Sequence, residues 1–305
     1  MNEMNNYENT NKRMRTEDDL SEKEEDDSHV GGGYEGQGVV PVATRKKKKK
    51  ILSVLIIGFG GFGQFLAKTL NKHCNKIIGC NKSDMSQVAA DLGCDYIPLA
   101  DLEQFNPSLL IEVDIILFTV SILSFEKVIK TLPSSLFRNK LIVDALSVKM
   151  HAKEVLLETL PHECDILCTH PMFGPVSGAN GWQDLPFMFD KVRIRSQGQC
   201  RMEEFLSLWE REGCSMIEMP CEEHDLNAAR SQFLTHFVGR VLLEMNLQSS
   251  PIDTVGYRSL TQLASNVGQN SFDLFQGLSQ LNPHTEEVVV QFKDAIERVV
   301  HRLKD

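Results

Sequence analysis

The stretch ILSVLIIGFGGFGQFLAKTL, residues 51–70, decides the fold class. It begins with an almost continuous aliphatic run, which is typical of a central parallel strand covered on both faces. Glycines with the spacing G-x-G-x-x-G follow, and a helix-like segment begins at once. In this context the glycines permit a tight turn, a close approach of backbone to a pyrophosphate, and close packing of helix on strand. The residues that we expect to bind a dinucleotide here are Gly58, Phe59, Gly60, Gly61, Phe62 and Gly63.

Further aliphatic segments follow, and helix-like segments alternate with them. They cover residues 76–80, 113–121, 140–147 and 165–170. Such alternation predicts an α/β fold with a Rossmann-type doubly wound parallel sheet. We expect the strands to stop after about residue 200 and the rest of the chain to be all helical. The predicted organisation is a disordered charged tail and linker over 1–50, a dinucleotide-binding domain over 51–200 and a helical domain over 201–305.

Composition excludes several classes of protein. The chain has 305 residues and a net charge of −10, which argues against general nucleic-acid binding. It has no apolar run long enough to span a bilayer, and its cysteines form no C-x-x-C pair or metal-ligand cluster. The first fifty residues are rich in acidic side chains, whereas transit peptides are poor in them. We therefore expect a cytoplasmic protein, with a plastid location as the alternative, and a solvated spacer at the lysine run 45–50.

The residues after the second expected strand indicate which dinucleotide binds. An NAD site usually has Asp or Glu at the end of this strand, about 20 residues beyond the glycines, to bind the ribose 2′-hydroxyl. The chain instead reads Cys80-Asn81-Lys82-Ser83-Asp84. Lys82 offers a positive charge and Ser83 a hydroxyl to a 2′-phosphate, whereas Asp84 either reaches a ribose or starts the next helix. We therefore expect NADP, with Asn81 to Asp84 among the residues that bind it.

Polar residues end three of the other expected strands. Ser121 ends one, Ser147 and Lys149 follow another, and His170 ends a third. The carboxyl ends of parallel strands form one edge, where we expect these residues to meet a nicotinamide ring, with Ser121 and Lys149 among the cofactor ligands. A neutral imidazole, with a usual pKa of about 6.5, is a suitable base for a hydroxyl proton, and such a base contributes roughly 10²–10⁴ in rate. Pro171 restricts the backbone of His170 toward an extended conformation, which aims the ring.

A helix expected to begin near Asp225 has a distinctive polar stripe. At about 100° per residue, Asp225, Ala229, Gln232, His236 and Gly239 fall on one side, and apolar residues fall on the opposite side. A solvent-facing side is usually rich in Lys and Glu, which this stripe lacks. The pattern favours the wall of a cleft over a solvent face.

At this point the sequence resembles a known family. The segments IIGFGGFGQFLAKTL, DALSVK, THPMFGPVSG, CEEHD followed by SQF and TH, and NSFDLF are similar, in this order, to plant-type arogenate/prephenate dehydrogenases of the TyrA family. The resemblance covers nearly everything from Ile51 to about Leu281. It implies a nucleotide-binding domain followed by a helical dimerisation domain, and a homodimer.

The resemblance also implies a reaction. Family members oxidise a cyclohexadienol with loss of carbon dioxide, which gives tyrosine from arogenate or 4-hydroxyphenylpyruvate from prephenate. By this resemblance His170 accepts the hydroxyl proton, Ser147 helps to hold the hydroxyl and His170, and Gln232 and His236 contact the substrate or orient the cofactor. The arginine that bacterial members use for the ring carboxylate has no counterpart at its place, and Arg258 is the nearest substitute.

Asp225 is expected to set the choice of substrate. By resemblance, a carboxylate after CEEH pairs with the ammonium group of arogenate, which the keto acid prephenate lacks. A role as N-cap of its own helix is compatible with this one. We therefore favour NADP-dependent arogenate dehydrogenase. The alternatives are a prephenate dehydrogenase and a catalytically silent NADPH-binding protein.

Overall fold

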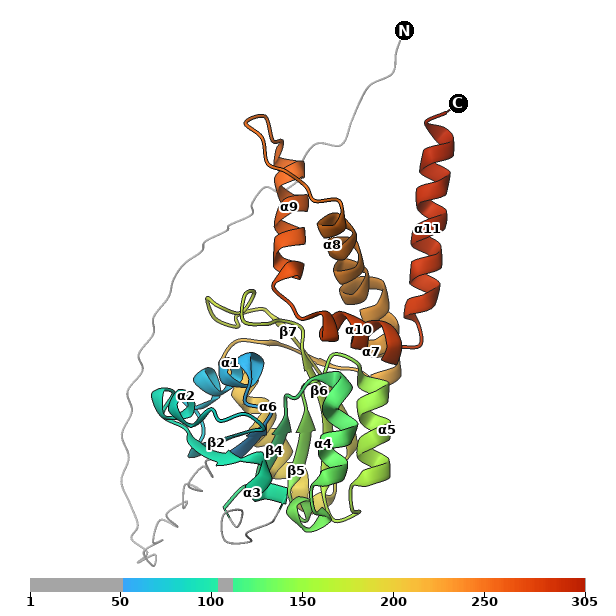
Figure 1. The fold of residues 1–305 in the computed structure, drawn as a ribbon. Coiled ribbons are helices and arrows are strands. Elements are labelled where there is room, and N and C mark those ends of the chain that lie inside the picture. The colour runs from blue at the N-terminus through green and yellow to red at the C-terminus, as the bar shows by residue number, and fades with distance from the viewer. Residues whose placement is uncertain (1–51, 104–111, 305) are drawn as a thin grey trace, which may run out of the picture. The chain divides into compact units, whose positions relative to one another are not determined.

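The computed structural model of the chain describes residues 52–103 and 112–304. The expected tail over 1–50, with the lysine run, lies outside these residues. Within them, eight strands form a single sheet (Figure 1). The strands are β1 (Ser53–Ile57), β2 (Lys76–Asn81), β3 (Asp95–Pro98), β4 (Ile115–Phe118), β5 (Leu141–Asp144), β6 (Asp165–Pro171), β7 (Pro186–Arg193) and β8 (Ser215–Glu218).

The order of the strands confirms the Rossmann-type doubly wound sheet. The order is β3-β2-β1-β4-β5-β6-β7-β8, and β1 to β6 pair in parallel throughout. The direction of winding reverses between β1 and β4, which is where ligands bind in such sheets. Two features differ from the expectation. Strand β7 is antiparallel to β6, and β8 pairs with β7 beyond residue 200, so the expectation that strands stop near that point is wrong.

Helices cover both faces of the sheet and continue beyond it. Those between the strands are α1 (Gly61–Leu70), α2 (Ser86–Asp91), α3 (Leu99–Glu103), α4 (Phe125–Thr131), α5 (Lys149–Thr159) and α6 (Gln199–Arg211). Short 3-10 turns are η2 (Ile122–Ser124), η3 (Ser134–Phe137) and η4 (Ser196–Gly198). After β8 come α7 (Cys221–Ala228), the π-helical turn η5 (Ala229–Phe233), α8 (Leu234–Glu244), α9 (Val255–Gly268), α10 (Phe272–Leu281) and α11 (Thr285–Arg302).

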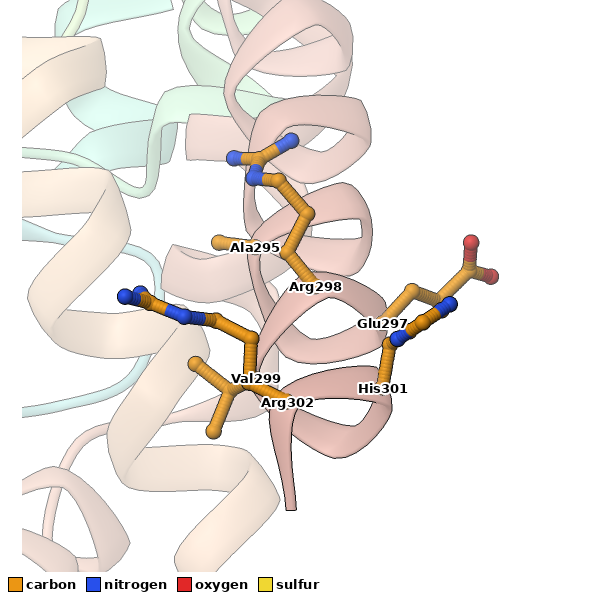
Figure 2. Close-up of a pocket in the computed structure, with 6 residues that line it drawn as sticks. All are labelled: Ala295, Glu297, Arg298, Val299, His301 and Arg302. Carbon is orange, nitrogen blue, oxygen red and sulfur yellow. The ribbon is translucent and has the colours of Figure 1, made fainter. Parts of the chain in front are cut away.

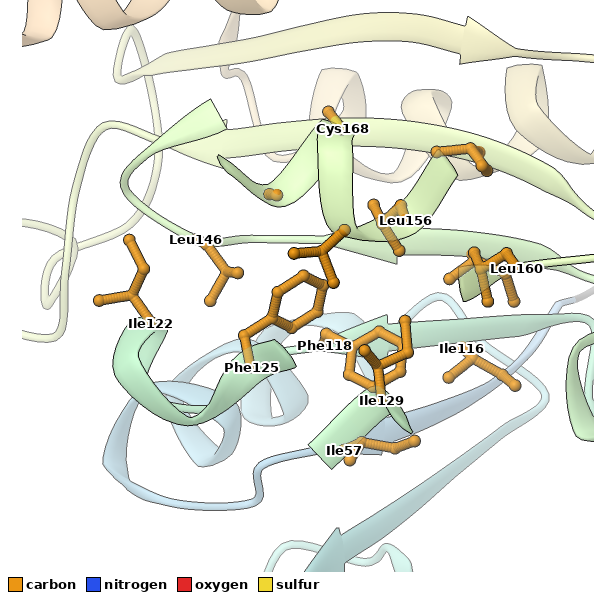
Figure 3. Close-up of a cluster of buried hydrophobic side chains, with 14 of the residues drawn as sticks. Ile57, Ile116, Phe118, Ile122, Phe125, Ile129, Leu146, Leu156, Leu160 and Cys168 are labelled. Carbon is orange, nitrogen blue, oxygen red and sulfur yellow. The ribbon is translucent and has the colours of Figure 1, made fainter. Parts of the chain in front are cut away.

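Alternate residues of each strand enter two separate cores. In β1, Leu55 and Ile57 belong to one cluster, whereas Val54 and Ile56 belong to the other, as the two-residue period of a strand requires. The first cluster, part of which Figure 3 shows, packs the sheet against α4, α5 and the start of the helical region. The second packs it against α1 and α6. Because both faces are covered, the strands read as continuous aliphatic runs in the sequence.

All described residues after β8 are helical or in connecting turns. Helix α7 begins at Cys221, four positions before Asp225, so Asp225 lies inside the helix and is not its N-cap. Helices α7 and α8 are continuous through the π-helical turn, a rare element that often marks a functional region. The division into a nucleotide-binding and a helical domain stays a prediction, and the sheet itself extends to Glu218.

Candidate functional site

The glycine loop after β1 has the geometry that a dinucleotide needs. Gly58 has φ +103°, and an added Cβ would lie 2.5 Å from the Val120 nitrogen of the neighbouring β4 loop. At Gly63 an added Cβ would lie 2.5 Å from the Gly58 oxygen, so only glycine lets the helix approach the strand this closely. At Gly60 nothing lies within 4 Å of an added Cβ, which leaves open space over the loop. The first N–H groups of α1 have no partner within the helix and can bind phosphate.

The two phenylalanines of the loop are placed differently from the glycines. Phe59 is fully buried, its ring packs against Gly79, and its backbone N–H is bonded to the Cys80 oxygen. Phe59 therefore fixes the glycine loop against β2 from inside the protein. Phe62 is half-buried, with its ring 6.1 Å from that of Phe65.

The segment after β2 presents its polar side chains to solvent. Lys82 and Ser83 are exposed. The Asp84 carboxylate accepts a 2.9 Å hydrogen bond from the Ser86 backbone, which lowers the pKa of Asp84 and starts α2. Of its two expected roles, the structure therefore shows the one at the start of the helix. The Asn81 amide bonds to the Ser83 oxygen, which shapes the turn around Lys82.

The other two expected cofactor ligands differ sharply in exposure. Ser121 is exposed and precedes η2 after β4. Lys149 is completely buried, where its ammonium group forms an ion pair with Asp144 and donates to the Thr169 oxygen at 2.6 Å. This placement contradicts a role for Lys149 as a cofactor ligand, because its charge is taken up inside the protein.

His170 lies at the carboxyl end of β6 and is only 3% exposed. Its Nδ1 is 2.8 Å from Nε2 of His224, and Nδ1 of His224 is in turn 2.8 Å from Oδ1 of Asp225. Burial, then the neighbouring His224, then Lys149 hold the pKa of His170 well below its usual 6.5. The imidazole is therefore neutral near pH 7 and able to accept a proton.

His224 is a site residue that the sequence analysis missed. It is 3% exposed and links His170 to Asp225. Ser147, in contrast, is half-buried, and the described residues show no hydrogen bond between it and His170. No pattern in the sequence identifies His224 as a site residue; the one signal is that it directly precedes Asp225.

The position of Asp225 contradicts its expected role as a substrate ligand. The side chain is completely buried, and its two oxygens accept 2.8 Å hydrogen bonds from the backbone N–H groups of Lys149 and Met150. Asp225 thus caps the N-terminus of α5, a different helix from its own, and Oδ1 also bonds His224. With both oxygens engaged inside the protein, neither is available to a substrate ammonium group.

Gln232, His236 and Arg240 lie four residues apart along one side of the π-helical turn and α8. Each is half-buried, and each has a buried polar atom without a hydrogen-bond partner among the described residues: Oε1, Nδ1 and Nε, respectively. Burial, and then the charge of Arg240, lower the pKa of His236. Arg240 also donates to the Asn270 oxygen at 2.7 Å and lies over the Phe272 ring. Unpartnered buried polar atoms call for a ligand or water, so this row is a candidate substrate surface.

Arg258 and a hollow on the surface of α11 are not part of the candidate cofactor and substrate sites described above. Arg258 is exposed and donates to the Asp253 oxygen at 3.1 Å, which makes it a poor candidate for a substrate carboxylate. In the hollow on α11, Arg298, Val299 and Arg302 point to one side of the helix, and Glu297 and His301 to the other (Figure 2). None of the residues discussed above as cofactor or substrate ligands lines it. In the described residues, no helix is long and apolar enough to cross a bilayer.

Two family profiles match this chain. One, described as "Prephenate dehydrogenase, nucleotide-binding domain", matches residues 66–215. The other, described as "TYRAAT1-like, C-terminal domain", matches residues 241–305. The first match runs from within α1 to the first residue of β8, and the second from the last turn of α8 to residue 305.

Solved structures share the fold at low sequence identity. A prephenate dehydrogenase from A. aeolicus, in complex with hydroxyphenyl propionate and NAD+, aligns with a TM-score of 0.62 and 18% identity, over 85% of this chain and 94% of that one. A Synechocystis arogenate dehydrogenase aligns with a TM-score of 0.58 and 17% identity, over 83% and 92%. At such identities the likeness concerns the fold alone.

Two Arabidopsis thaliana proteins are much more similar in sequence. Arogenate dehydrogenase 1, chloroplastic, is 47% identical over 83% of this chain, which spans 39% of the relative's length. Arogenate dehydrogenase 2, chloroplastic, is 45% identical over 84% of this chain, which here spans 71% of the relative. With this identity, this coverage and the glycine loop and buried histidine described above, the chain belongs to the arogenate dehydrogenase family.

Proposed function

We propose that the chain is an oxidoreductase that converts arogenate to tyrosine by NADP-dependent oxidative decarboxylation. The observation that carries the proposal is the buried, neutral His170 at the carboxyl edge of the sheet, the same edge at which the glycine loop lies. A bound nicotinamide dinucleotide supplies the acceptor of the substrate's hydride. His170 accepts the proton of the ring hydroxyl, and the half-buried Ser147 after β5 positions that hydroxyl.

NADP rather than NAD is supported by charge at the end of β2. Lys82 is exposed there, and Asp84 is engaged at the start of α2. A 2′-phosphate would therefore meet a cation, with the nearest carboxylate held by a backbone N–H. Ser121 after β4, the glycines of the loop and Ser83 complete the proposed cofactor site.

Support for arogenate over prephenate comes from the two Arabidopsis relatives. Asp225 adds nothing to it, because its oxygens bind backbone N–H groups and His224. For the substrate we propose the row of Gln232, His236 and Arg240, whose unpartnered atoms include a pure acceptor and a charged donor. Arg240, already held over Phe272, takes the place of Arg258 as the partner of a substrate carboxylate.

Initial rates with arogenate and with prephenate, each with NADP and with NAD, test the proposal. We expect the fastest turnover with arogenate and NADP, and loss of turnover in His170→Asn with cofactor binding retained. Faster turnover of prephenate would replace the substrate and leave the chemistry in place. Binding of NADP without turnover of any pair would show a silent NADPH-binding protein and overturn the proposal.

We also propose a homodimer formed through the helical part. Beyond its first turn, α11 carries Val290, Ile296, Val299 and Val300, and Leu303 caps its C-terminus; these five residues are 45–82% exposed. Exposed apolar patches of this kind mark interaction sites, and a second copy offers the same patch to itself. Val299→Glu should produce monomers in sedimentation equilibrium, and Arg298→Glu, at least about 100° around the helix from Ile296, Val299, Val300 and Leu303, should not.

The proposed compartment follows the two Arabidopsis relatives, whose names support a plastid location. Fractionation of plant cells that express the full chain tests this location, and recovery of the protein outside the plastids would overturn it.

A further inference from the structure

The proposed base, His170, is connected through two further buried side chains to the N-terminus of a helix. His170 on β6 bonds His224 on α7, His224 bonds Asp225, and Asp225 caps the N-terminus of α5. Each distance is 2.8 Å, and no member is more than 3% exposed. The backbone of Asp225 is held in place as well, because the Asn282 side chain donates a 2.8 Å hydrogen bond to its carbonyl oxygen.

The partners of Asp225 assign the protons along this row. Both of its oxygens accept N–H groups of the α5 backbone, so Asp225 is an acceptor toward His224 as well. Nδ1 of His224 must then carry a hydrogen, and in the uncharged form of the ring this makes Nε2 an acceptor. Nε2 of His224 can bond Nδ1 of His170 only if that Nδ1 carries a hydrogen too.

We infer that His224 and Asp225 are positioning residues that hold His170 in the Nδ1–H tautomer, with the lone pair of its Nε2 free for the substrate hydroxyl. We call the three side chains the His170–His224–Asp225 relay. The inference rests on the proposed function, in which His170 accepts the hydroxyl proton. It gives Asp225 and His224 a joint role that neither the family profiles nor the relatives assign.

The proton step is balanced within the relay. The O–H bond of the substrate breaks, its electron pair stays on oxygen, and an Nε2–H bond forms on His170. The positive charge that results lies near the buried Lys149, which itself is paired with Asp144. His224 lies between this charge and the Asp225 carboxylate, and the hydrogen bonds through His224 let the carboxylate offset the charge from a distance.

The tautomer can be observed without substrate. Two-bond ¹H–¹⁵N spectra of the histidine rings, in the full chain near neutral pH, distinguish an imidazole that carries its hydrogen on Nδ1 from one that carries it on Nε2. We expect His170 and His224 both as Nδ1–H tautomers, with His170→Asn and His224→Gln used to assign the signals. A wild-type His170 with its hydrogen on Nε2 would overturn the inference.

Kinetics of two His224 variants test the positioning role. His224→Leu removes the acceptor, and kcat should fall roughly 10²-fold or more with KM unchanged, because the base is then present in the wrong tautomer. In His224→Gln the side-chain oxygen can still accept from Nδ1 of His170, so much of kcat should return. His73→Leu is the matched control, since His73 also bonds a carboxylate, that of Glu212 at 2.5 Å, away from the site.

The outcomes separate this inference from the proposed function. If the wild-type protein turns over no substrate, the proposed function fails, and the spectra still test the tautomer. If the wild-type protein is active and both His224 variants keep its kcat, or both lose it equally with KM raised, His224 has only a packing role and the inference is wrong.

Discussion

Asp225→Asn should weaken folding and leave the substrate preference unchanged. Asp225 accepts three hydrogen bonds of 2.8 Å in a site with no solvent exposure. An asparagine has one oxygen in place of two. In its better orientation that oxygen keeps Lys149 and His224, and its NH₂ group then faces the backbone N–H of Met150, donor against donor.

The magnitude follows from what is lost in that orientation. A hydrogen bond to a charged group contributes about 1.5–3 kcal/mol, and an unpaired buried N–H costs about 1–3 kcal/mol. Met150 is half-buried, so water relieves part of the second cost. We expect the free energy of unfolding to fall by about 2–4 kcal/mol, which for a chain of this size lowers Tm by roughly 4–8 °C.

Urea unfolding at constant m-value measures this loss. Asp294→Asn, at an exposed position of α11, makes the same chemical change without buried partners and should shift stability by less than about 0.5 kcal/mol. Rates with arogenate and prephenate should fall together, because the carboxylate charge that offsets a protonated His170 is lost with either substrate. An Asp225→Asn protein as stable as the control that gains turnover of prephenate would refute this reasoning and restore Asp225 as a substrate ligand.

Three further predictions concern the cofactor loop and pH. Gly63→Ala should cost about 1–3 kcal/mol of stability, because its Cβ would lie 2.5 Å from the Gly58 oxygen; Gly60→Ala should leave stability unchanged and weaken NADP binding by roughly tenfold in calorimetry. Lys82→Ala should raise KM for NADP about tenfold and leave KM for NAD unchanged, and Lys82→Arg should preserve the preference; equal effects on both cofactors would remove Lys82 from the 2′-phosphate site. Burial lowers the pKa of His170 and His236 in the folded protein. Below about pH 6.5, the usual pKa of histidine, the unfolded chain therefore binds more protons than the folded protein. Stability should fall as the pH drops through about 6.5, by up to about 1.4 kcal/mol per pH unit for each histidine. Unfolding midpoints measured across this range should fall less steeply in His170→Asn than in the wild type.

The sheet could be predicted because its signal is local. The signals are the aliphatic run of β1, the glycines after it and the β-α units that follow. Each lies within a short stretch of sequence whose residue pattern indicates its own secondary structure. Strand β8 was missed because its four residues, Ser215–Glu218, are half-buried or exposed and carry no such run. The antiparallel β7 was missed because direction is set by the connection, which a strand's own residues do not reveal.

The candidate site could be predicted only in part, because its contacts are distant in the sequence. His170 was found from its place at a strand end, next to Pro171. The partners of Asp225 are backbone N–H groups 75 and 76 positions earlier, which no periodicity within its own helix indicates. Lys149 at a strand end looks like a ligand, yet Asp144, five residues before it, holds its charge.

The π-helical turn at Ala229–Phe233 has a geometric consequence for the whole α7–α8 segment. A π turn contains one residue more than the matching stretch of α-helix, so everything after it is rotated by about 100° relative to an uninterrupted helix. The turn therefore rotates α8 about the common helix axis relative to α7. Asp225 on α7 faces α5, and this rotation allows His236 and Arg240 on α8 to face a different direction. Deleting one residue from 229–233 would remove the offset, and His236 and Arg240 would then be replaced at the proposed substrate surface by their neighbours along α8.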